Sequence, residues 1–244
     1  MARTTPPRRA DMAAVFPELA PLARQTVRLH PRLGTPTVRD SSIGGPLLWP
    51  AAEPWPVCSE PHPEDDLPVS PADVRLRRRI ETGRAGGSPT AQEREAMEAT
   101  YEGHPWSREP NALLPVAQLY ARDVPGLPCP DGADLLQVLW CPLEHDPEWM
   151  PAARPVWRSS SGAGVLLTVQ PESADVSNHG QYVPEPCVLH PEVVTEYPGP
   201  LELQPGLADR IGDWCEQEFT GTDPRYLYAE EFRAYYHPHL EVMQ

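Results

Sequence analysis

Proline is the residue that most limits what this chain can fold into. The sequence contains 34 prolines among 244 residues, about 14% where roughly 5% is usual. Each proline fixes its own backbone φ and lacks the amide donor that helices and sheet interiors use. Regular structure is therefore expected in short segments, separated by long proline-rich loops.

Apolar residues are concentrated in the middle of the chain. Residues 111–170 contain 16 Leu, Ile, Val or Phe, whereas residues 58–110 contain 5. A segment that is poor in apolar residues cannot bury enough surface to form its own core. We therefore predict a single domain over residues 1–244, with a polar helical insertion at about 58–110.

The strand and helix patterns predict an α+β fold. Short apolar runs at 113–121, 135–141 and 165–170 favour strands, and weaker runs follow at 188–189 and 193–197. The connections between the strong runs are too short for crossover helices, which favours antiparallel pairing. Helical spacing is found at 206–219, after Ser88-Pro89, and more weakly around 12–19. We expect a mostly antiparallel sheet with flanking helices.

The net charge and the cysteine count limit which kinds of partner and which cellular compartment we expect. The formal net charge is -15, and all 20 basic residues are arginines. A negative surface repels nucleic acid and anionic membranes at long range, so we predict neither as a partner. No apolar run approaches the roughly 20 residues that span a bilayer. No secretion signal is recognisable, and five cysteines do not suggest a disulfide framework, so we expect a cytoplasmic protein.

A run of arginines is the exception to the acidic balance. It comprises Arg75, Arg77, Arg78, Arg79 and Arg84. Charge runs usually form a solvated helical face, and this is the interpretation that we favour. The alternative is a regulatory surface that binds an acidic partner.

Cysteine and histidine pairs are the features that indicate chemistry. Phosphate-binding loops, nucleophile elbows and zinc-protease motifs are absent from the sequence. Three cysteines, however, have a histidine within four positions. The pairs are Cys58 with His62, Cys141 with His145, and Cys187 with His190. Two such pairs would complete a tetrahedral zinc site, and the alternative is that the cysteines are small buried apolar residues.

Tryptophans among prolines form the second notable feature. Trp49 and Trp55 lie in the segment 44–56, which proline keeps extended. Tryptophans held in this way can line a groove for an extended peptide. The alternative, which we favour for at least one of them, is that they belong to the core.

Several motifs together resemble the YwqG-like family of unknown function. They are the Gly44-Gly45-Pro46 element with Trp49-Pro50 and Trp55-Pro56, a strand that ends in Gln118, Asp131-Gly132, the run 135–138, and Trp140-Cys141-Pro142. The similarity covers roughly residues 27–220, outside the arginine-rich insertion. The resemblance implies an α+β fold. It also implies a distant relationship to the programmed-cell-death-two group, whose members are chaperones of a ribosomal protein, while some bacterial members have been proposed as immunity or peptide-binding modules.

We therefore predict a non-catalytic module that binds a protein or peptide and acts as a chaperone or an immunity protein. A sheet edge and a groove would hold the partner, with Trp49, Trp55, Gln118 and Gln137 as the binding residues. The acidic charge favours a basic protein or peptide as the partner. The alternative is a zinc-dependent hydrolase or a structural-zinc protein that uses the cysteine–histidine pairs.

Overall fold

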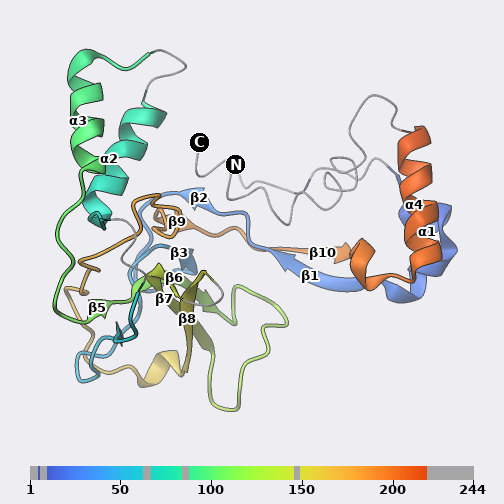
Figure 1. The fold of residues 1–244 in the computed structure, drawn as a ribbon. Helices are drawn as coiled ribbons and strands as arrows, with labels where there is room; N and C mark the ends of the chain where they lie inside the picture. Colours follow the sequence, from blue (N-terminus) through green and yellow to red (C-terminus); the bar gives the residue numbers. More distant parts are fainter. Residues whose placement is uncertain (1–4, 6–9, 63–66, 84–87, 146–148, 219–244) are drawn as a thin grey trace. The chain divides into compact units, whose positions relative to one another are not determined.

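The computed structural model describes residues 5, 10–62, 67–83, 88–145 and 149–218 (Figure 1). The chain divides into two compact units. Among the described residues, one unit combines those up to His30 with those from His190 to Glu218, and the other consists of those within Pro31–Leu189. The sequence led us to expect one domain over 1–244, and each unit is described here by itself.

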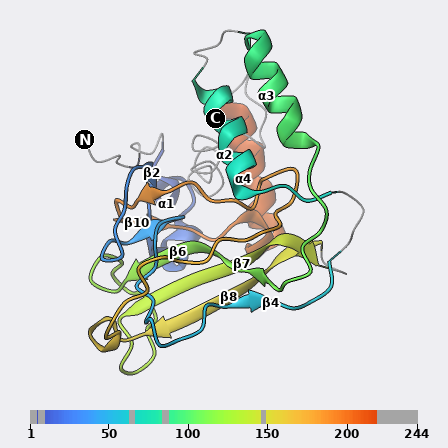
Figure 2. The ribbon, with the colours of Figure 1, turned by 90° about the vertical axis from the view of Figure 1, so that its left-hand side faces the viewer.

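The larger unit is built on a six-stranded antiparallel sheet. Its order is β2-β9-β3-β6-β7-β8, and Figure 2 shows β6, β7 and β8 side by side. The strands are β2 (Arg32–Leu33), β3 (Ser42–Ile43), β6 (Leu114–Tyr120), β7 (Leu135–His145), β8 (Met150–Arg158) and β9 (Cys187–Val188). A separate antiparallel pair joins β4 (Val57–Cys58) to β5 (Asn111–Ala112). The predicted α+β class with a mostly antiparallel sheet is confirmed.

One predicted strand is wrong, and another was missed. Residues 165–170 form only an isolated bridge between Leu166 and Pro50, while the Leu167 amide donates to the Trp49 carbonyl. Strand β7 pairs with β6 on one side and with β8, which contains Pro151 and Pro155, on the other. Proline is tolerated in an edge strand because an outward-facing position needs no ladder donor.

Both edges of this sheet are poor sites for adding a strand. In a regular strand, residues four positions apart direct their backbone nitrogens to the same lateral edge. Because Pro151 and Pro155 have no N–H group, two amide donors are missing along one edge of β8. At the opposite edge, β2 has only two residues. Short edge strands and edge prolines are common means of preventing edge-to-edge pairing. The sheet-edge part of our predicted binding mechanism is therefore disfavoured.

Two capped helices occupy much of the segment 58–110. They are α2 (Pro71–Thr82) and α3 (Ala91–Tyr101). Ser70 and Thr90 each form a reciprocal capping box with the acidic residue three positions on, Asp73 and Glu93. Helix α3 thus begins after Thr90 rather than at the expected Ser88-Pro89.

The arginines of α2 do not form a uniformly solvated face. The Arg77 side chain is buried, donates to the Asn178 carbonyl at 2.6 Å and lies over the Tyr101 ring. Arg78 donates to the carbonyls of Val183 and Gly180 and pairs with Glu185. Our interpretation of the run as an exposed face is therefore wrong at Arg77. These two arginines of α2 hold the loop 178–185 by hydrogen bonds to its carbonyls. Arg84 lies outside the described residues.

Replacing Arg78 with alanine is expected to destabilise the larger unit. The change leaves the two carbonyls and Glu185 without their charged donor, which should cost about 2–3 kcal/mol. The neighbouring Arg79 is exposed, so Arg79→Ala should change stability by less than about 0.5 kcal/mol. Urea unfolding of the two variants measures the difference, and equal stabilities would contradict this role of Arg78.

The Gly44-Gly45 element has a steric explanation. Gly44 has φ +59°, and a Cβ added there would lie 2.8 Å from the Glu185 carbonyl oxygen. A Cβ on Gly45 would lie 2.6 Å from the Pro36 ring. Both positions therefore require glycine to bring the chain from β3 into the Trp49 segment.

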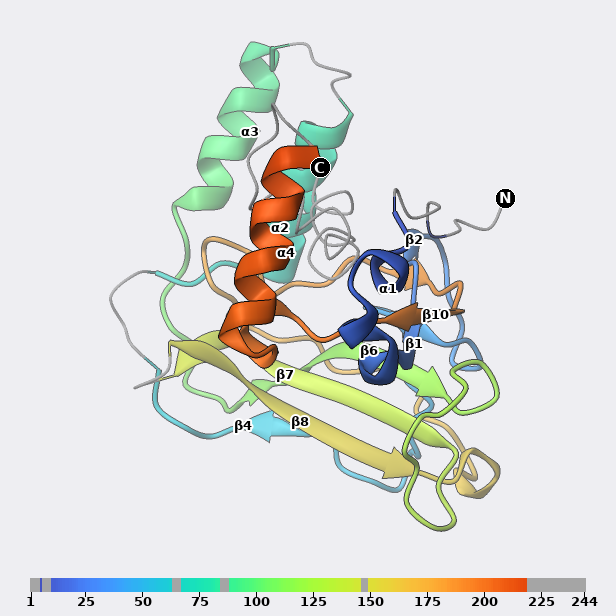
Figure 3. The ribbon, with the colours of Figure 1, turned by 90° about the vertical axis from the view of Figure 1, so that its right-hand side faces the viewer.

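The smaller unit combines a two-stranded ribbon with the helix α4 and shorter helical segments (Figure 3). Strand β1 (Arg24–Arg28) pairs antiparallel with β10 (Glu192–Glu196). Its helical elements are α1 (Met12–Val15), η1 (Pro17–Leu22), η3 (Pro200–Glu202) and α4 (Pro205–Glu218). Their core contains Met12, Phe16, Leu19, Leu203, Ile211 and Cys215. No helix in the described residues is long and apolar enough to cross a membrane.

Candidate metal centre

Two segments that are far apart in the sequence supply the candidate ligands. Cys58 ends β4 and His62 follows it, while Cys141 and His145 both lie on β7. The register between β7 and β8 shifts between Trp140 and Glu144, a stretch that contains Cys141 and ends one residue before His145. Bulges of this kind redirect side chains and often lie beside functional sites.

The four side chains converge in the geometry of a metal site. One ligand atom from each of Cys58, His62, Cys141 and His145 lies within 4.8 Å of the others. His62 Nε2 is 3.2 Å from Cys141 Sγ, and His145 Nε2 is 3.8 Å from Cys58 Sγ. Zinc–sulfur and zinc–nitrogen bonds of about 2.3 and 2.05 Å place tetrahedral N and S ligands about 3.6 Å apart. The two cross-pair distances bracket this value.

The site is enclosed by the core. Cys58 and Cys141 belong to a buried cluster that also contains Leu139 and Leu143. The ring of Trp106 stacks on His62 with an interplanar angle of 8°. Three of the four candidate ligands are buried and His62 is half-buried.

Burial also affects the protonation of two of the candidate ligands, Cys141 and His62. It raises the pKa of the Cys141 thiol to about 12, because a thiolate without a cation is costly in apolar surroundings. Burial, followed by the proximity of His145, lowers the pKa of His62. Neutral imidazole is the form that binds a metal, and a cation at the site would favour the thiolate.

His145 has a feature that fits a metal ligand. Its Nδ1 atom is buried and has no hydrogen bond within the described part of the chain. This atom lies 3.4 Å from Glu60 Oε2. Metal-ligating histidines generally donate their second nitrogen to a carboxylate or carbonyl. Glu60, which lies between Cys58 and His62 in the sequence, is placed for that role.

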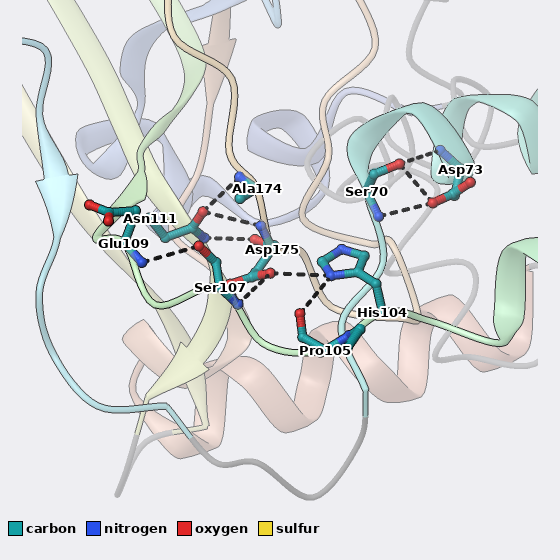
Figure 4. Close-up of polar contacts among 9 residues, drawn as sticks. All are labelled: Ser70, Asp73, His104, Pro105, Ser107, Glu109, Asn111, Ala174 and Asp175. Atoms are coloured by element: carbon teal, nitrogen blue, oxygen red, sulfur yellow. Dashed lines mark hydrogen bonds and ion pairs between the residues drawn. The ribbon is translucent and has the colours of Figure 1, made fainter.

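A polar network fixes the strand that carries Cys58 (Figure 4). Asn111 pairs with Cys58 across the β4–β5 sheet. Its side chain donates to the Asp175 carbonyl and accepts from the amides of Ala174 and Asp175. The buried Asp175 carboxylate in turn accepts from the Ser107 amide at 3.1 Å. These bonds tie β5 and the segment before it to residues 174–175, and β5 in turn pairs with the strand that carries Cys58.

The third cysteine–histidine pair does not join this group. Cys187 is fully buried in β9, opposite Ile43 and Leu33, and burial raises its thiol pKa to about 11. His190 belongs to the smaller unit, where its amide donates to the Leu29 carbonyl. For Cys187 the structure agrees with the alternative interpretation of a small buried core residue.

The predicted peptide-binding residues need a correction. Trp49 is 3% exposed, Gln118 and Gln137 are wholly buried, and Trp55 is half-buried. The Trp49 and Trp55 rings contact each other with centroids 5.1 Å apart. Trp55 Nε1 donates to the Leu113 carbonyl, and Arg158 lies over the Trp49 ring. Trp49, Gln118 and Gln137 therefore form the interior, because their apolar area and hydrogen bonds are already used within the fold.

The two glutamines hold the tryptophan segment on the sheet. Gln118 Oε1 accepts from the Leu48 amide at 2.7 Å and from Gln137 Nε2 at 2.9 Å. Gln118 Nε2 donates to the carbonyls of Val38 and Asp40. Gln137 Nε2 also donates to the Leu48 carbonyl, and its Oε1 accepts from Arg158. Each amide bonds in several directions at once, which is how a buried polar group avoids a desolvation penalty.

Sequence reasoning missed the residues around the candidate ligands. Glu60, Trp106 and Asn111 carry no local motif, although an acidic residue between Cys58 and His62 is a weak signal for a histidine partner. The exposed pair Trp149 and Met150, at the start of β8, was also missed. Comparison with protein-family models gave no match, and comparison with curated proteins found no similar sequence.

Proposed function

We propose that this protein holds one structural zinc ion and acts by binding another protein rather than by catalysis. The observation that carries the zinc part of the proposal is the convergence of Cys58, His62, Cys141 and His145 in one enclosed site. Two thiolates and two imidazoles are a donor set that suits zinc.

The number of ligands favours a structural over a catalytic ion. Structural zinc sites are closed by four protein ligands, whereas catalytic sites keep a position open for water or substrate. With all four side chains bound, this site would have no such position. Joining β4 to β7 would stabilise the larger unit, since metal binding contributes to folding free energy. The alternative of a zinc hydrolase is disfavoured for the same reason.

The partner that we propose is a basic protein or peptide. The net charge of -15 supports it, because a negative field steers a positively charged partner. The resemblance to the YwqG-like family supports a binding, chaperone-like or immunity role. With Trp49, Gln118 and Gln137 interior, we propose Trp149 and Met150 as the contact residues. They are 53% and 61% exposed, and tryptophan and methionine are enriched in interfaces.

Affinity capture from the source cell extract tests this function. At low salt, the immobilised protein should retain a basic protein that is released at high salt. The double variant Trp149→Ser, Met150→Ser should lose it. A matched control is Val165→Ser, Val169→Ser, which alters two residues that are 81% and 80% exposed elsewhere in the unit. Equal capture by all three proteins, or capture of no protein, would contradict the proposed contact.

A further inference from the structure

We infer that Cys58 and Cys141 form a disulfide under oxidation and that this releases the metal ion. The metal release rests on the proposed function, whereas the disulfide depends only on the geometry of the two thiols. All five cysteines are free thiols. Cys58 and Cys141 are the two that share one cluster, with their sulfurs within 4.8 Å. A disulfide requires an S–S distance of about 2.05 Å, so the two sulfurs must approach by less than about 3 Å.

The two cysteines differ in their exposure to solvent. Cys58 is 8% exposed, whereas Cys141 is completely buried. A hydroperoxide should therefore react first at Cys58, and Cys141 should act as the resolving thiol. The other cysteines of this unit, Cys129 and Cys187, are not members of the cluster.

The reaction with hydrogen peroxide takes place in two steps. The Cys58 thiolate attacks one peroxide oxygen, the O–O bond breaks, hydroxide leaves, and Cys58 becomes a sulfenic acid. The Cys141 thiolate then attacks the sulfenic sulfur, the S–O bond breaks, and a second hydroxide leaves as the disulfide forms. The two thiolates lose two electrons, which reduce the peroxide, and both hydroxides take up protons to become water. The ion loses two of its four ligands and dissociates.

The disulfide would take over the role of the ion as a cross-link. It joins β4 to β7 and closes a loop of more than 80 residues, from position 58 to position 141. Disulfides that close long loops stabilise most in the chain-entropy account. We therefore expect the oxidised protein to be free of metal, still folded, and more stable than a variant that has lost a ligand.

The test uses protein loaded with one equivalent of zinc and treated with hydrogen peroxide. Released zinc is measured with a colorimetric chelator, thiols are counted after denaturation, and linked peptides are mapped by mass spectrometry without reduction. The expected result is one zinc released for every two thiols lost, with Cys58 linked to Cys141 and zinc binding restored by a phosphine reductant. Cys187→Ser should give the same result. Retention of zinc while other thiols are oxidised, or loss of zinc with both cysteines unlinked, would overturn the inference.

A second measurement separates this inference from the proposed metal site. If the reduced protein binds no zinc, the proposed function fails. Metal-free protein is then oxidised with diamide, a thiol-specific oxidant. A Cys58–Cys141 linkage in that sample would support the disulfide even without a metal site, and its absence would overturn it.

Discussion

Replacing Cys141 with serine is expected to abolish metal binding and to lower the stability of the larger unit substantially. Structural zinc contributes about 10–16 kcal/mol of apparent binding free energy in small zinc-dependent peptides. This unit also has a core of its own, so we expect a smaller loss of about 3–5 kcal/mol, comparable to breaking a buried charge pair. A loss of this size lowers the melting temperature by roughly 10 °C in a domain of 150–250 residues. Calorimetry and metal analysis of the purified variant provide the two readouts.

Cys187→Ser is the matched control for this prediction. Cys187, like Cys141, is completely buried, but it lies in β9 and outside the candidate site. A buried hydroxyl costs about 1–3 kcal/mol wherever it is placed, so stability alone does not separate the two variants. Metal content does. Cys187→Ser should retain one zinc ion per chain and should lose stability on treatment with a chelator, whereas Cys141→Ser should not respond to the chelator. Equal zinc content in both variants would contradict the ligand assignment.

Replacing Gln118 with methionine should be the most destabilising change in the sheet away from the metal centre. Methionine has a similar volume but cannot form the four hydrogen bonds that Gln118 makes to Leu48, Gln137, Val38 and Asp40. Each buried group left without a partner costs about 1–3 kcal/mol. At least the Leu48 amide and the Asp40 carbonyl lose a partner, so we expect a loss of about 3–5 kcal/mol. Denaturant unfolding measures it.

Gln25→Met provides the comparison for the glutamine prediction. Gln25 is exposed on β1 and donates to the Thr195 hydroxyl at 2.8 Å. An exposed hydrogen bond is replaced by water, so the expected change is within about 0.5 kcal/mol. If Gln118→Met proved as stable as Gln25→Met, the buried amide network would not have the structural role that we assign to it.

The local patterns of the sequence predicted much of the sheet. The apolar runs at 113–121 and 135–141 became β6 and β7, and the weaker runs became β9 and β10. The missed strand β8 contains two prolines, which argue against a strand unless it lies at an edge. Its edge position depends on how β7 pairs, and this pairing cannot be read from the residues of β8 alone.

The candidate metal centre, too, could be predicted only in part from local sequence, because its assembly depends on how distant strands are placed. The spacing of each cysteine–histidine pair is local and was visible in the sequence. Which pairs meet depends on β4 being placed near β7. The spacing of Cys187 and His190, one residue shorter than in the other two pairs, was not by itself a reason to exclude them. The glutamines illustrate a different limit. Glutamine is mostly exposed in proteins, but opposite positions on β6 and β7 place Gln118 and Gln137 where they can bond to each other and to the Leu48 backbone.

We propose that two cysteines and two histidines bind one metal ion. Titration of the reduced, metal-free protein with cobalt(II), followed by visible absorption, tests it most directly, because tetrahedral cobalt with thiolate ligands has intense and characteristic bands. We predict a spectrum of this kind that saturates at one equivalent, disappears when zinc is added, and is absent in Cys141→Ser. A wild-type protein that binds no cobalt, or binds it with the weak spectrum of an octahedral, oxygen-ligated ion, would contradict the account.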